Sequence, residues 1–341
     1  MAKIKAHYIP PFTITSETVR LISEISETLG KISASGTFEL APVTKQENRL
    51  KSIQATLAIE KNSLSLEQVT AIINGKKVIG NSREIQEVKN TSAAYEMFEN
   101  LDCLSSKNLL ETHSVLMDTL VDEPGQYRSG EVGIMIGKKV VHIAPPATQV
   151  PHLMLDLFTW LKSTDTHPLI ASSVFHYEFE FIHPFADGNG RMGRLWQMII
   201  LSKWRPLMAY LPVETVLHKR QNEYFQMLEV SDQQADSTAF VEFLLTAIKD
   251  ALHETVQTDT ESVPVNDHIR KLLRLLIKNS LTASDLMKSL DVSHRQTFTK
   301  SYLHPAIEDG YIEMTHPEKP NSHTQHYRIT AEGVAAVKDM Q

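Results

Sequence analysis

The chain has 341 residues, 42% of them hydrophobic, and a formal net charge of −7 at pH 7. This length suffices for two or three compact cores, and the acidic balance argues against broad affinity for nucleic acid over the whole surface. No stretch approaches the roughly 18 consecutive apolar residues that a membrane-spanning helix requires. The amino terminus, "MAKIKAHYIPPFTIT", lacks the apolar region of a secretion signal, so we expect a cytoplasmic protein. The single cysteine, Cys103, excludes an internal disulfide and a Cys-based zinc cluster.

Helical periodicity is the dominant pattern in the first two thirds of the chain. Amphipathic stretches cover residues 17–31, 45–60, 66–74, 83–99, 106–118, 149–163, 169–182 and 191–204. Start and stop signals agree with this pattern, because Ser65 can cap one stretch and Gly75 can close it. The main body is therefore predicted to be a helical bundle.

One segment, "GEVGIMIGKKVVHIAPP" between Gly130 and Pro146, departs from the helical pattern. Its apolar residues alternate with other residues, stop at "GKK" and resume after it. Such alternation around a short glycine-containing break predicts a β-hairpin.

A polar stretch around Pro264 indicates a linker, and a second unit is predicted from Asn266. Its pattern is a helix, then helix, turn and helix, then two strands around a loop rich in Pro and Asn. This is the order of a winged helix-turn-helix domain. Residues 266–341 contain ten Lys or Arg and nine Asp or Glu, a balance that is weak for DNA binding. Two alternatives stay open: a groove contact through Arg295, Gln296, Thr297 and Lys300, or binding to a protein or packing on the main body of the chain.

Residues 181–194, "FIHPFADGNGRMGR", concentrate polar and glycine residues between two helical stretches. Gly188 and Gly190 allow successive backbone N–H groups to point inward as an anion site at the start of the second helix. Arg191 and Arg194 are three residues apart and therefore add charge from one side of the first turn. The pattern predicts a site for more than one phosphate.

Three further side chains in this stretch indicate group transfer. Asp187 would repel phosphate unless a cation lay between them, so we interpret it as a magnesium ligand. Asn189 can donate its side-chain amide to the phosphate oxygens, and His183 can accept a proton from an attacking hydroxyl. The residues together predict phosphoryl or nucleotidyl transfer.

The stretch "HPFADGNGRMGR" resembles the signature of the Fic family, His-Pro-Phe-x-Asp-Gly-Asn-Gly-Arg-x-Gly-Arg, at every fixed position. The resemblance implies transfer of AMP from Mg-ATP to a Ser, Thr or Tyr hydroxyl of a target protein, with release of pyrophosphate. It implies His183 as general base, Asp187 as magnesium ligand, and nucleotide binding along Gly188, Asn189, Gly190, Arg191, Met192, Gly193 and Arg194.

Other segments resemble further parts of Fic proteins. The hairpin resembles the flap that pairs with the target, through Val132, Gly133, Ile134, Met135 and Ile136, and Asn222 and Tyr224 are candidates for the adenine pocket. Helical packing is nearly as good an interpretation of Tyr224. The expected fold is mainly α: an extension at 1–105, a Fic helical bundle with a β-hairpin flap at 106–258, and a winged helix-turn-helix at 266–341.

The segment "TLAIEKN" is similar to the inhibitory motif of many Fic proteins. The resemblance implies that Glu60, four residues after Thr56, pairs with Arg194 and takes the place of the γ-phosphate. Lys61 stands where the family has Gly or Asn. The same Ser-to-Glu spacing also occurs from Ser63 and from Ser92, so we prefer Glu60 for its place near the end of a helix.

Two other functions stay open. One is a DNA-binding regulator whose Fic core only senses nucleotide. The other is hydrolytic removal of AMP at the same site, with Glu60 activating water. The expected ligands are ATP and Mg²⁺, the expected partner is a target protein that could be the chain itself, and no membrane partner is expected.

Overall fold

The computed structural model describes residues 8–34, 42–136, 139–261, 267–277, 279–292, 294–319, 322 and 325–338. The chain forms two compact units, Met1–Gln257 and Thr258–Gln341, which we describe separately. The linker predicted around Pro264 lies outside the described residues. Within the described ranges, no helix combines the length and the apolar character needed to cross a bilayer.

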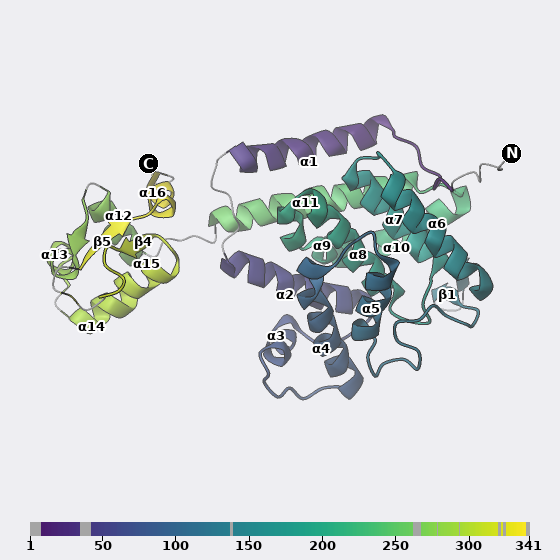
Figure 1. Cartoon of the computed structure of the whole chain (residues 1–341), viewed down its shortest axis with the longest axis horizontal. Helices are drawn as coiled ribbons and strands as arrows, with labels where there is room; N and C mark the ends of the chain where they lie inside the picture. Colours follow the sequence, from purple (N-terminus) through teal and green to yellow (C-terminus); the bar gives the residue numbers. More distant parts are fainter. Residues whose placement is uncertain are drawn as a thin grey trace. The chain divides into compact units, whose positions relative to one another are not determined.

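The first unit is almost entirely helical (Figure 1). Its helices are α1 (Ser16–Ala34), α2 (Pro42–Ile59), α3 (Leu66–Ile73), α4 (Ser82–Glu96), η1 (Phe98–Asn100), α5 (Ser106–Leu116), η2 (Ala147–Gln149), α6 (Val150–Ser163), α7 (Pro168–Ile182), α8 (Asn189–Trp204), η3 (Pro206–Tyr210), α9 (Val213–Lys219), α10 (Gln221–Gln234) and α11 (Thr238–Glu261). The prediction of a mainly helical fold is confirmed.

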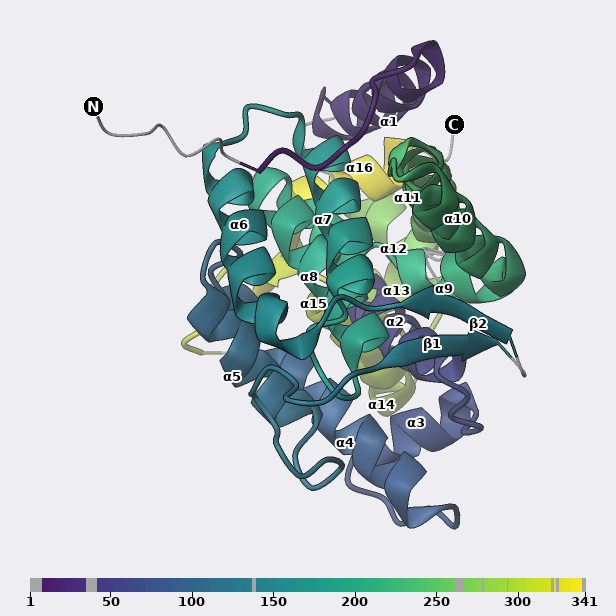
Figure 2. The same cartoon turned by 90° about the vertical axis from the view of Figure 1, so that its right-hand side faces the viewer.

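Helix α7 forms the centre of this unit and packs along α8 (Figure 2). It begins at Pro168, which suits the first helical position because the missing N–H has no helical partner there. Nearly every side chain of α7 is buried, including the carboxylates of Glu178 and Glu180. The loop between α7 and α8, which contains the glycine-rich stretch, is therefore mounted on the most buried part of the fold.

Helix α2 is attached to the bundle by a buried carboxylate. Glu214 at the start of α9 accepts hydrogen bonds from Ser52 Oγ of α2 at 2.8 Å and from Tyr95 of α4 at 3.0 Å. Burial raises the pKa of Glu214, and the two hydroxyl donors partly offset that effect. The contacts hold α2 in a defined position, and its last residues point toward α8.

The predicted hairpin is present as β1 (Gly133–Ile136) and β2 (Lys139–Ile143). The strands are antiparallel, with an irregular register between Ile134 and Met135. Residues 137 and 138, at the predicted turn, lie outside the described residues. Figure 2 shows the hairpin along one side of the bundle, with β2 toward α10.

The second unit contains α12 (Asp267–Leu276), β3 (Leu281–Thr282), α13 (Ala283–Ser289), α14 (Arg295–Phe298), η4 (Thr299–Leu303), α15 (His304–Glu308), β4 (Ile312–Met314), β5 (His326–Ile329) and α16 (Ala331–Lys338). Its strands form an antiparallel sheet in the order β3, β5, β4. The helix expected after residue 292 is divided by the π-helical η4, and β3 and α16 were not predicted.

Candidate active site

The α7–α8 loop begins and ends with left-handed residues. His183 follows the last residue of α7 with φ 50° and ψ 60°, and its N–H still donates to the Phe179 carbonyl at 2.9 Å. Gly188 precedes α8 with φ 84°, a conformation that glycine adopts without steric cost. These two residues turn the chain sharply, so that a short loop connects His183 to the first turn of α8.

Asn189 closes this loop through its side chain. Its Oδ1 accepts from the Phe185 N–H at 2.9 Å, and its Nδ2 donates to the Phe185 carbonyl at 2.8 Å. Both polar ends of the amide are therefore engaged with the backbone. Nδ2 carries two N–H donors and the loop uses one of them, so donation from the other to phosphate stays a prediction.

His113 of α5 contacts the α7–α8 loop through a hydrogen bond and a ring stack. Its Nδ1 accepts from the Gly125 N–H at 2.9 Å, so the ring proton lies on Nε2, which is 3.0 Å from the Asp187 carbonyl. The ring also stacks on Phe185 at 3.6 Å between centroids. Burial lowers the pKa of His113 to about 4, which keeps the ring neutral. Sequence reasoning missed this residue.

Asp187 lies among hydrogen-bond donors. Its Oδ1 accepts from the Gly188 N–H at 2.6 Å and from Arg191 Nη2 at 3.3 Å, and its Oδ2 lies 3.2 Å from Arg83 Nη2. The side chain is 46% exposed, so a solvated cation can approach it. Arg83, from α4, was not predicted.

Arg191 is a buried cation whose nitrogens are only partly used. Its side chain is 4% exposed, yet Nε and Nη1 have no hydrogen-bond partner among the described residues. A buried charged donor without partners is costly, which indicates a site that an anion completes. The N–H groups of Asn189, Gly190 and Arg191, in the first turn of α8, have no helical partners and are also available to an anion at this end of the helix.

Arg194 is held by the end of α2. Arg194 Nη2 lies 2.7 Å from Glu60 Oε1, and its Nε donates to Thr56 Oγ1 at 2.9 Å. Burial by itself would lower the pKa of Arg194, but the combined effects of Glu60, Tyr224 and Glu180 outweigh it and raise the pKa. A side chain on Gly190 would collide with the Glu60 carboxylate, so Glu60 lies directly against the start of α8.

The turn that carries Glu60 has the hydrogen bonds of a Schellman helix end. The Lys61 N–H donates to the Ala58 carbonyl at 2.9 Å, and the Asn62 N–H donates to the Leu57 carbonyl at 3.1 Å. Lys61 adopts φ 69°, the conformation that Gly or Asn usually supplies. The helix end thus forms with lysine at this position.

Comparison with known proteins identifies the family of the chain. Residues 103–201 match the Fic/DOC family, and residues 267–330 match the C-terminal domain of the Fic-like proteins named for filamentation induced by cAMP. A solved Fic family protein from Desulfovibrio desulfuricans G20 is 54% identical, with a TM-score of 0.72, over 95% of this chain and 99% of that chain. The chain belongs to the Fic family.

Curated relatives of this Fic protein carry the name protein adenylyltransferase. The Fic protein of Aedes aegypti is 28% identical over 211 residues, which are 59% of this chain and 40% of that protein. The fic-1 protein of Caenorhabditis elegans is 33% identical over 202 residues, 55% of this chain and 37% of that protein. The chain therefore spans about two fifths of the length of the curated relatives it matches.

The hairpin of this Fic protein is attached to the α7–α8 loop by Arg128, a residue that sequence reasoning missed. Its Nε donates to the His183 carbonyl at 2.8 Å, Nη1 to Gly130 at 2.9 Å and Nη2 to Pro145 at 2.6 Å. Gly130 and Pro145 flank the hairpin, so one buried guanidinium fixes both of its ends beside His183. Among the described residues, no third strand pairs with β1, the strand that contains Gly133, Ile134, Met135 and Ile136 and follows Val132.

Tyr224 is enclosed by the helices of the Fic core. It is 1% exposed, and its hydroxyl lies 3.1 Å from His176 Nε2. The ring therefore offers no open face to adenine here, in agreement with the packing interpretation. Asn222 is exposed on α10, where an adenine contact stays a prediction. Met192 is fully buried, and a Cβ on Gly193 would lie 3.0 Å from Glu180 Oε1, so both residues serve the packing of α8.

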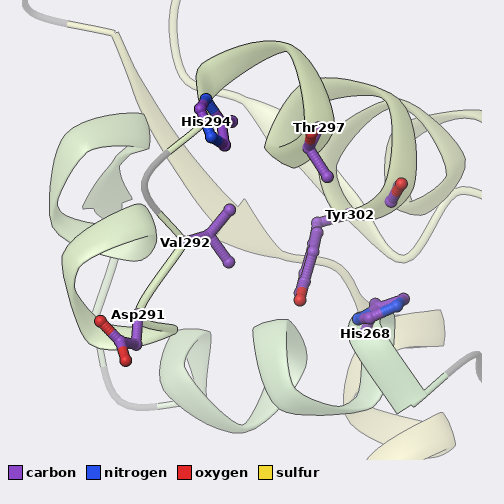
Figure 3. A pocket seen from close by; sticks show the side chains of 7 residues that line it. His268, Asp291, Val292, His294, Thr297 and Tyr302 are labelled. Carbon is purple, nitrogen blue, oxygen red and sulfur yellow. The ribbon is translucent and has the colours of Figure 1, made fainter.

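The second unit of this Fic protein has a shallow hollow of about 240 Å³ beside α14. Figure 3 shows Thr297 turned into this hollow, with Val292 and Tyr302 on its walls. The four side chains considered for a DNA groove, Arg295, Gln296, Thr297 and Lys300, are all exposed, and DNA binding through them stays a prediction.

Proposed function

We propose that this Fic protein transfers AMP from ATP to a Ser, Thr or Tyr hydroxyl of a target protein, and that Glu60 restrains the transfer. The observation that carries the proposal is the arrangement of two buried arginines at the start of α8. Arg191 has two nitrogens without a hydrogen-bond partner among the described residues, and these could bind an anion. Arg194 is paired with a carboxylate that a phosphate could replace. The names of the curated relatives support the same chemistry.

His183 is the proposed general base. Its Nδ1 lies 3.4 Å from the Glu180 carbonyl, which favours the proton on Nδ1 and leaves Nε2 as the basic nitrogen. Nε2 takes the proton of the target hydroxyl, the hydroxyl oxygen bonds to the α-phosphorus, and the bond from the α-phosphorus to the bridging oxygen breaks. Pyrophosphate leaves with the electron pair of that bond.

Asp187 fits Mg²⁺ as a single carboxylate beside an anion site. The described residues contain no group of three His, Cys, Asp or Glu side chains that could hold a metal by themselves. Mg²⁺ is commonly held by one or two carboxylates together with substrate phosphates and water, which matches Asp187 next to Arg191. When bound there, the metal neutralises phosphate charge during transfer.

Glu60 restrains the reaction by occupying the γ-phosphate position. Its carboxylate satisfies the charge of Arg194 when nucleotide is absent, so ATP must displace a charge-assisted hydrogen bond at 2.7 Å before its γ-phosphate can bind. The proposed restraint therefore acts on the productive orientation of ATP. His183 and Asp187 keep their own positions.

Transfer can be tested with ATP labelled on the α-phosphate and, in parallel, on the γ-phosphate. We expect protein-bound α-label to rise about tenfold or more in Glu60→Gly, a factor equivalent to about 1.4 kcal/mol. Glu60→Gln, which keeps the size of the side chain, separates the loss of charge from the loss of bulk. His183→Ala in the Glu60→Gly background should abolish the label.

Other outcomes would indicate other functions. Retained γ-label would contradict AMP transfer and indicate phosphate transfer, as in the Doc branch of the family. If neither label is retained in any variant, the proposal fails. Release of AMP from a modified protein by the wild type would then favour the reverse reaction, and operator-specific DNA binding without turnover would favour a nucleotide-sensing regulator.

A further inference from the structure

Arg83 lies far from the glycine-rich loop in sequence, yet its guanidinium contacts the proposed metal ligand. It is the second residue of α4, and its Nη2 is 3.2 Å from Asp187 Oδ2. We propose that Arg83 is a positioning residue that sets the affinity of Asp187 for its divalent cation. This inference rests on the proposed function, in which Asp187 holds Mg²⁺.

The two oxygens of Asp187 are held differently. Oδ1 is engaged within its own loop, by the Gly188 N–H and by Arg191, whereas Oδ2 is engaged by Arg83 from another element. A guanidinium on a carboxylate oxygen withdraws negative charge from a cation ligand, and it repels a second cation nearby. A divalent cation on Asp187 must therefore displace Arg83 or bind against its charge.

Arg83 has other acceptors within reach when Asp187 is taken. Its Nη1 already donates to the Leu120 carbonyl at 3.1 Å, and its Nε lies 3.6 Å from Glu87 Oε1. These contacts keep the side chain near the loop and give its charge an alternative partner. The exchange from Asp187 to Glu87 needs only a change of side-chain conformation.

Glu87 connects this exchange to the turn that carries Glu60. Its other oxygen, Oε2, accepts from Asn62 Nδ2 at 2.8 Å, and Asn62 is two residues after Glu60. The Asn62 amide also donates to the Glu84 carbonyl at 3.1 Å, so the first turn of α4 is bonded to the inhibitory turn and, through Arg83, to the metal ligand.

The test measures nucleotide binding instead of transfer. In the Glu60→Gly background, the affinity for α,β-methylene-ATP, which cannot donate AMP, is measured by calorimetry at increasing Mg²⁺ concentrations. We expect Arg83→Gln to lower the Mg²⁺ concentration for half-maximal binding by about twofold to fivefold, the size expected for a half-exposed charge pair. Arg83→Lys, which keeps the charge, should shift it less.

Lys89→Gln is the matched control, because it removes one positive charge from the exposed face of the same helix. The inference is overturned if Arg83→Gln leaves the Mg²⁺ midpoint unchanged or raises it, or if Lys89→Gln shifts it equally. A purely structural role would lower the melting temperature of the metal-free protein without moving the midpoint. Binding that needs no Mg²⁺ in the parent would overturn the metal site of the proposed function together with this inference.

Discussion

Lys61 has a backbone conformation that is unfavourable for a residue with a Cβ. Its φ of 69° lies in the left-handed region, which costs L-residues roughly 1–2 kcal/mol. The hydrogen bonds of Lys61 and Asn62 to the end of α2 hold it there. The turn that presents Glu60 is therefore formed against a local conformational cost.

Lys61→Gly should raise the free energy of unfolding of the first unit by about 1 kcal/mol, because glycine removes the left-handed penalty. The greater conformational entropy of glycine in the unfolded chain cancels part of the gain. All three tryptophans, Trp160, Trp196 and Trp204, belong to this unit, so urea unfolding followed by tryptophan fluorescence reports on it. Lys61→Ala keeps the Cβ and should give no such gain. An equal gain in both variants would mean that removal of the charge, not relief of the backbone, is responsible.

At the scale of single residues, local spacing predicts some of the site and misses the rest. His183, Asp187, Arg191 and Arg194 fall within twelve residues, so their chemistry is legible from the sequence. Arg83, His113 and Arg128 contact Asp187 or His183, which lie 55 to 104 positions away in the sequence. Contacts over such separations leave no local pattern. The contacts of the Asn189 amide with the Phe185 backbone were also not predicted, because a side chain that folds back on its own loop leaves no local pattern.

At the scale of elements, Arg128 joins the end of α7 to the hairpin β1–β2. Arg128→Met leaves the carbonyls of Gly130, Pro145 and His183 without this donor, and we expect a loss of about 2–4 kcal/mol in the free energy of unfolding. Amide hydrogen exchange should also become faster in β1 and β2 than in α7.

Arg205→Met is the control for this change, since Arg205 is exposed and its guanidinium lies over Trp204. We expect the control to stay within about 0.5 kcal/mol of the wild type. If hydrogen exchange in the hairpin is the same in Arg128→Met and in the wild type, Arg128 does not hold the hairpin.

The elements themselves were largely predictable where periodicity is sustained. Helices α1 to α8 and the hairpin occur where apolar spacing placed them, with α8 starting two residues earlier than expected because Gly188 ends the loop. Helices α9, α10 and α11 were not among the predicted stretches. The division of one expected helix into α14, η4 and α15 was not predictable from periodicity. A π-helical turn changes the hydrogen-bond pattern without interrupting the run of helix-compatible residues.

At the scale of the whole molecule, buried histidines make stability depend on pH. The pKa of His113 is about 4 in the folded chain and about 6.5 when unfolded. Below pH 6.5 the unfolded chain binds a proton at this ring and the folded chain does not. The contribution of His113 to stability therefore falls as pH decreases from about 6.5 to about 4 and is constant below that.

His113→Gln offers an amide acceptor and donor in place of the ring but does not titrate. Between pH 7 and pH 4.5 the wild type should lose about 2–3 kcal/mol more than this variant, measured by urea unfolding at each pH. The comparison between the two chains cancels other groups such as Glu178, whose pKa burial raises to about 7. Parallel pH profiles would show that His113 already titrates normally in the fold.

The pair Glu60 and Arg194 belongs to one folded unit, and the two residues are 134 positions apart in the sequence. Under the proposed function, the inhibitor and its site are parts of the same molecule, so their effective concentration is a constant of the fold and does not change with dilution or expression level. ATP therefore competes with a carboxylate whose effective concentration is fixed. Any event that moves the end of α2 away from α8 would lower the ATP concentration at which the γ-phosphate binds.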